Sequence, residues 1–64
     1  MIANDQQLEA TLQRIAWLQR QVAHLHKTEK NPANYRAASS GFLAELDRMH
    51  LAVREYFSQP AASR

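Results

Sequence analysis

Two apolar stripes with helical spacing, separated by a short segment that contains a proline, constrain this chain more than any other feature. Steps of three and four residues keep side chains on one face of an α-helix, which turns about 100° per residue. The first stripe comprises Leu8, Leu12, Ile15, Leu18, Val22 and Leu25, and the second comprises Phe42, Leu46, Met49, Val53 and Tyr56. We therefore expect an all-α fold, an antiparallel two-helix hairpin.

Capping and helix-breaking residues predict the first helix and the turn that follows it. Asn4 or Asp5 can cap a helix over residues 5–29, because a short side-chain oxygen accepts a hydrogen bond from an unpaired N–H of the first turn. Pro32 disfavours helical backbone at the residue before it, so we expect the first helix to end there and a turn to occupy residues 30–38.

The second helix is predicted over residues 39–57, with Ser39 or Ser40 as its cap. Residues 33–38 are compatible either with a helical turn that follows the proline or with an ordered loop. Small residues and a second proline predict a frayed tail over 58–64. The whole chain of 64 residues is then a single small helical-hairpin domain.

The register of the hairpin follows if its turn is centred near Asn34. Facing positions then have numbers that sum to about 67 or 68: Leu25 faces Phe42, Val22 faces Leu46, Leu18 faces Met49, and Ile15 faces Val53. Every layer is apolar on both sides. The predicted hairpin core is Leu8, Ile15, Leu18, Val22, Leu25, Phe42, Leu46, Met49, Val53 and Tyr56.

Further apolar side chains flank this seam, and one pair of helices cannot cover all of them. Such uncovered apolar groups indicate a second contact. The simplest solution is a homodimer in which two hairpins form a four-helix bundle about a two-fold axis, although a different protein partner would meet the same need. The predicted interface residues are Leu12, Trp17, Leu43, His50, Leu51 and Phe57.

Side chains that carry chemistry are not arranged for catalysis or for metal binding. His24 and His26 lie two residues apart, about 200° around a helix, whereas metal-binding histidine pairs on a helix are normally four apart. Glu45 and Asp47 diverge in the same way, and the chain has no cysteine. We therefore expect no enzymatic activity, no cofactor and no metal.

The charge balance is mixed, with eight Lys and Arg against six Asp and Glu and a net charge of +2. Four cations gather toward the turn and are candidates to contact an anionic partner: Arg20, Lys27, Lys30 and Arg36. They support an alternative function, a nucleic-acid-associated regulator, but net charge alone does not make the clustered basic face that nucleic-acid binding needs. The chain shows neither a signal peptide nor a membrane span, so a cytoplasmic location is expected.

Two short stretches resemble the N-terminal helical region of bacterial antitoxins of the host-inhibition-of-growth type. They are Met1-Ile2-x-Asn4-Asp5-Gln6-Gln7-Leu8 and Leu43-Ala44-Glu45-Leu46 with the later Glu55-Tyr56. The whole chain, with Asn31-Pro32-x-Asn34-Tyr35-Arg36 and the run from Gly41 to Met49, is also similar to small bacterial proteins of no established activity. These antitoxins carry a DNA-binding helix-turn-helix after this region, which this sequence does not contain. The resemblance therefore implies dimerisation or capture of a toxin-like protein, and we expect a small non-catalytic oligomerisation or partner-binding module.

Overall fold

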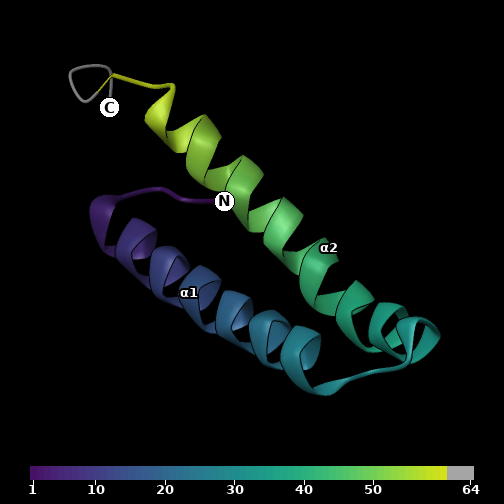
Figure 1. The fold of residues 1–64 in the computed structure, drawn as a ribbon. Helices are drawn as coiled ribbons and strands as arrows, with labels where there is room; N and C mark the ends of the chain where they lie inside the picture. Colours follow the sequence, from purple (N-terminus) through teal and green to yellow (C-terminus); the bar gives the residue numbers. More distant parts are fainter. Residues whose placement is uncertain (61–64) are drawn as a thin grey trace.

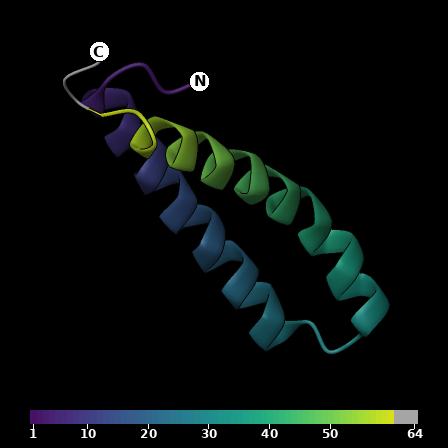
Figure 2. The ribbon, with the colours of Figure 1, turned by 90° about the horizontal axis from the view of Figure 1, so that it is seen from above.

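Two α-helices joined by three residues make up the computed structural model, which describes residues 1–60. Helix α1 spans Asp5–Thr28 and helix α2 spans Pro32–Phe57, and they run antiparallel beside each other (Figures 1 and 2). The molecule is a thin rod with extents of 49 × 15 × 12 Å. The predicted all-α hairpin is confirmed. Of the predicted tail over 58–64, the last four residues lie outside the described part of the chain.

The N-terminus of α1 is held by reciprocal hydrogen bonds between side chains and backbone. Asn4, one of the two predicted caps, accepts a hydrogen bond at Oδ1 from the Gln7 backbone N–H at 2.9 Å. Gln7 reaches back with its own side chain, and its Oε1 accepts from the Ala3 N–H at 2.8 Å. Two backbone donors that lie before or within the first turn thus have partners, which fixes the start of the helix.

The turn is shorter than predicted, and the predicted serine caps of the second helix are wrong. Asn31 caps α2, because its Oδ1 accepts from the N–H groups of Ala33 at 2.9 Å and Asn34 at 3.2 Å. Pro32 occupies the first helical position, where a missing N–H costs nothing. Pro32 therefore begins α2, whereas α1 has already ended at Thr28, with extended backbone at Glu29. Residues 33–38 are helical, and Ser39 lies inside α2 with 1% of its surface exposed.

The short turn also changes the register of the hairpin from the predicted one. Four side-chain pairs bridge the helices: Arg14 with Glu45, Trp17 with Phe42, Asp5 with Tyr56, and His26 with Tyr35. The position numbers in each pair sum to 59 or 61, not 67 or 68. The helices are thus displaced by about seven residues from the predicted pairing. Because each stripe repeats at about seven residues, this shift keeps apolar side chains opposite each other.

The core lies along the seam and is thin. Of the predicted core residues, Ile15, Leu18, Leu46 and Tyr56 are buried, and Leu18 is completely inaccessible to solvent. The other six are half-buried: Leu8, Val22, Leu25, Phe42, Met49 and Val53. At the open end of the hairpin, the Tyr56 hydroxyl donates a hydrogen bond to Asp5 Oδ1 at 2.5 Å. This bond ties the last turn of α2 to the first turn of α1.

Candidate interaction surfaces

Large apolar side chains remain exposed on both helices of the hairpin. All six residues predicted for an interface are exposed, including His50. The exposed fraction of the residue surface is 39% for Leu12, 40% for Trp17, 43% for Leu43, 57% for Leu51 and 64% for Phe57. Scattered exposed apolar residues are normal on a protein surface. Their arrangement around the two helices therefore decides whether they form a site.

One side of the hairpin is marked by a salt bridge between the helices. Arg14 Nε lies 3.2 Å from Glu45 Oε2, and both side chains are partly exposed. The Arg14 guanidinium also lies 4.7 Å from the ring centroid of Trp17, which in turn meets Phe42 edge-on at 6.3 Å. Trp17 is thus held between a cation and an aromatic ring of its own hairpin. We call this side the Arg14–Glu45 side.

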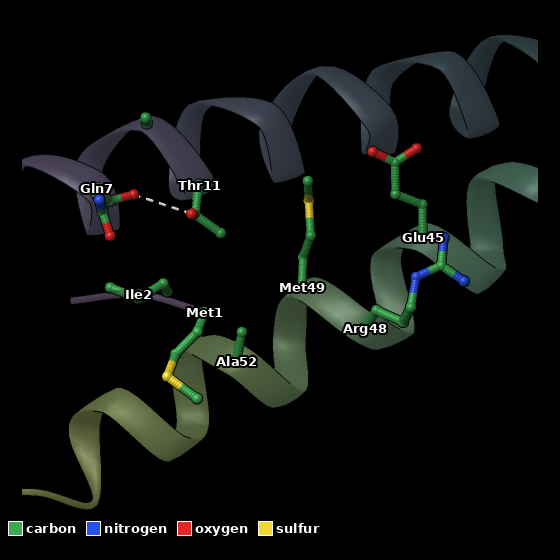
Figure 3. A pocket seen from close by; sticks show the side chains of 9 residues that line it. Met1, Ile2, Gln7, Thr11, Glu45, Arg48, Met49 and Ala52 are labelled. Carbon is green, nitrogen blue, oxygen red and sulfur yellow. Dashed lines mark hydrogen bonds between the residues drawn. The ribbon is translucent and has the colours of Figure 1, made fainter.

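The N-terminal segment lies along the Arg14–Glu45 side near the open end of the hairpin. Figure 3 shows Ile2 between the two helices, with Met49 pointing from α2 toward α1. An open groove of about 560 Å³ is lined here by Met1, Ile2, Gln7, Ala10, Thr11, Glu45, Arg48, Met49 and Ala52. Because Ile2 is half-buried, the chain's own N-terminus covers part of the apolar surface on this side.

The opposite side of the hairpin presents exposed leucines from both helices. Leu12 precedes Arg14 by two residues, and Leu43 precedes Glu45 by two, which places each leucine about 200° around its helix from the salt bridge. His50 and Phe57 follow Leu43 at intervals of seven and continue its row along α2. We call this surface the Leu12–Leu43 face; it includes Leu12, Ala16, Leu43, His50 and Phe57, and the uncharged Gln19, which follows Leu12 by seven residues.

Two of the six predicted interface residues lie off the Leu12–Leu43 face. Trp17 lies on the Arg14–Glu45 side, three residues after Arg14. Leu51 follows the buried Leu46 by five residues, about 140° around α2, and so points away from α1. The sequence indicated which apolar side chains are left uncovered. Helical spacing also places Leu12 and Trp17 on different sides of the first apolar stripe and Leu51 nearly opposite the second, as the structure has them.

The four predicted anion-contacting cations are all exposed and lie toward the turn. They are Arg20, Lys27, Lys30 and Arg36, and Glu29 is the only acidic residue between positions 20 and 40. Five acidic side chains and three arginines occupy the rest of the described chain: Asp5, Glu9, Glu45, Asp47 and Glu55, with Arg14, Arg48 and Arg54. The side-chain charge is therefore +3 at the turn end and −2 over the remainder.

The histidines and carboxylates considered for chemistry are dispersed over the surface. His24, His26 and His50 are exposed, and the His26 ring packs edge-on against Tyr35 at 5.5 Å. Within residues 1–60, no three metal-ligating side chains come together in a way that could hold an ion. Neither helix of this part of the chain combines the length and the apolar character needed to cross a membrane.

No protein-family model, curated protein or solved structure matches this chain.

Proposed function

We propose that this chain is a non-catalytic self-association module whose hairpins pair to form a four-helix bundle. The observation that carries the proposal is the imbalance between covered and uncovered apolar side chains. Three large aliphatic side chains are buried in the seam, while five large apolar side chains on the two helices are at least 39% exposed. Pairing of two hairpins is the simplest way to cover the flank of each helix.

The accessible area of the molecule supports the same proposal. The chain exposes 4997 Å². A compact monomer of 7.4 kDa is expected to expose about 4200 Å² by the usual scaling of area with mass. The chain therefore carries an excess of about 800 Å², which is close to the area that each partner buries in a protein–protein interface of standard size.

Sedimentation equilibrium at micromolar concentration tests this proposal. We expect a mass of about twice 7.4 kDa, since burying the exposed apolar flanks stabilises the dimer. Circular dichroism on the same samples should show a predominantly helical chain. A folded, helical species that stays at the monomer mass up to the highest concentration tested would contradict self-association.

A further inference from the structure

We propose that a second copy of this chain packs on the Leu12–Leu43 face, with the turn end of one hairpin over the open end of the other. This inference rests on the self-association proposed above and adds to it the surface and the orientation. The occupant is the same chain because the face is self-complementary about a two-fold axis and because its two ends carry opposite charge.

The choice of face follows from what already occupies the two sides of the hairpin. On the Arg14–Glu45 side, a pair of charged side chains and the N-terminal segment lie over the seam, and a partner would have to desolvate or displace them. The Leu12–Leu43 face instead presents two exposed leucines and a half-buried alanine. Burying these three side chains requires no charge to be desolvated.

The position of this face also suits a two-fold axis. Ala16 is at the middle of α1, and Leu43 is within two residues of the middle of α2. A small residue beside larger ones lets side chains of facing layers interdigitate. An axis through this level brings the central parts of both copies into contact, so that the contact extends over most of the rod.

The orientation follows from the charge asymmetry along the rod. If both turn ends lay together, eight exposed cations from two copies would meet with two glutamates between them, and like charges repel. In the reversed arrangement, the +3 turn end of one copy lies over the remainder of the other, whose charge is −1 when the N-terminal ammonium of Met1 is added to the side-chain charge of −2. Asp5 and Glu9 then lie level with the last turns of α1 in the second copy, which contain His24 and Lys27.

A matched pair of leucine variants tests the face. Leu43→Glu places a charge on the Leu12–Leu43 face, and Leu51→Glu makes the same change eight residues later on the outward side of α2. We expect Leu43→Glu to raise the dimer dissociation constant at least about 100-fold, because a carboxylate would be buried without a partner, while Leu51→Glu changes it by less than about threefold. Sedimentation measures both. Equal effects of the two variants would overturn the choice of face.

Spin labels test the orientation independently, in a protein that is otherwise unaltered. The chain has no cysteine, so Ala33→Cys at the exposed start of α2 gives one label in each chain beside the turn. In the reversed arrangement we expect label separations of about 35 Å or more, the length of a 24-residue helix at about 1.5 Å per residue.

The outcomes of the spin-label experiment are distinct from one another. Two turn ends that lie side by side would give separations under about 20 Å, two helix diameters, and would overturn the orientation. Such a dimer would leave the proposed function standing. A complete lack of dipolar coupling, together with a monomer in sedimentation, would instead contradict self-association and this inference with it. Because Ala33→Cys alters no residue of the face, the measurement holds even if Leu43→Glu prevents folding.

Discussion

Replacing Leu18 with alanine is expected to lower the free energy of unfolding by about 2–5 kcal/mol. Leu18 is the one apolar side chain of the described hairpin that is completely inaccessible to solvent, and it packs in the cluster with Ile15 and Leu46. Truncation removes its buried methyl groups and leaves a cavity that the two helices cannot close without moving from their native positions. Because small domains have little stability to lose, this single change is expected to unfold a large fraction of the protein.

Leu51→Ala is the matched control for the Leu18 variant. It deletes the same atoms from a side chain that points to solvent, so we expect a change of about 0.5 kcal/mol or less. Urea titrations monitored by circular dichroism compare the variants, and equal protein concentrations are essential because association shifts apparent stability. If the two variants had equal midpoints, Leu18 would not be at the centre of the core.

Replacing Ser39 with leucine is expected to destabilise the hairpin by about 1–3 kcal/mol. Ser39 is almost fully buried, although serine is a small polar residue, and the register places it level with Val22 on α1. Its burial indicates that the two helices leave room for a small side chain only at this level. Three additional carbon atoms would force the helices apart or push the side chain out of its preferred rotamer.

Ser40→Leu provides the control for overpacking, because the neighbouring serine is exposed on the same helix. We expect this change to alter stability by about 0.5 kcal/mol or less. Thermal melts of the two variants at the same concentration give the comparison. If Ser39→Leu melted at the same temperature as Ser40→Leu, the helices would not approach closely at this level.

The spacing of apolar residues was sufficient to predict the hairpin, but it could not define the register. A pattern that repeats at about seven residues looks the same after a shift of one repeat, so Ile15 and Leu18 face apolar partners in either alignment. The length of the connection decides between the two. That length depends on Asn31 and Pro32, because Asn31 caps α2 and Pro32 is its first residue, which leaves only three residues between the helices.

Ser39 is a core residue that the sequence pattern does not predict, for a related reason. Serine is favoured at helix caps, so a serine pair after a proline predicts the start of a helix. One signal in the sequence pointed the other way: Ser39 lies four residues after Tyr35 and seven before Leu46, on the same face as the apolar stripe. In the candidate interface, the exposure of the apolar side chains could be predicted from their positions beside the apolar stripes. The side on which Trp17 lies also follows from helical spacing, whereas its contacts with Arg14 and Phe42 are seen only in the structure.

The three-residue connection also has a kinetic consequence. His26 and Tyr35 are in contact across the turn and are only nine residues apart in the sequence. Arg14 and Glu45, which pair farther from the turn, are separated by 31 residues, and Asp5 and Tyr56 by 51. Loop closure over about ten residues takes about 10–100 ns, and its entropic cost grows with the number of residues enclosed. We therefore expect contacts between the helices to form first near the turn and then progressively toward the open end.

Temperature-jump relaxation measurements on two alanine variants would reveal the order in which the two ends of the hairpin form. Leu25→Ala, near the turn, should mainly slow folding, and Val53→Ala, near the open end, should mainly accelerate unfolding. If Leu25→Ala instead mainly accelerated unfolding and Val53→Ala mainly slowed folding, the open end would form first. If interhelical contacts form first at the turn, they form last at the open end, which carries the N-terminal segment and its groove. Spontaneous opening of the native hairpin then starts there, beneath Ile2.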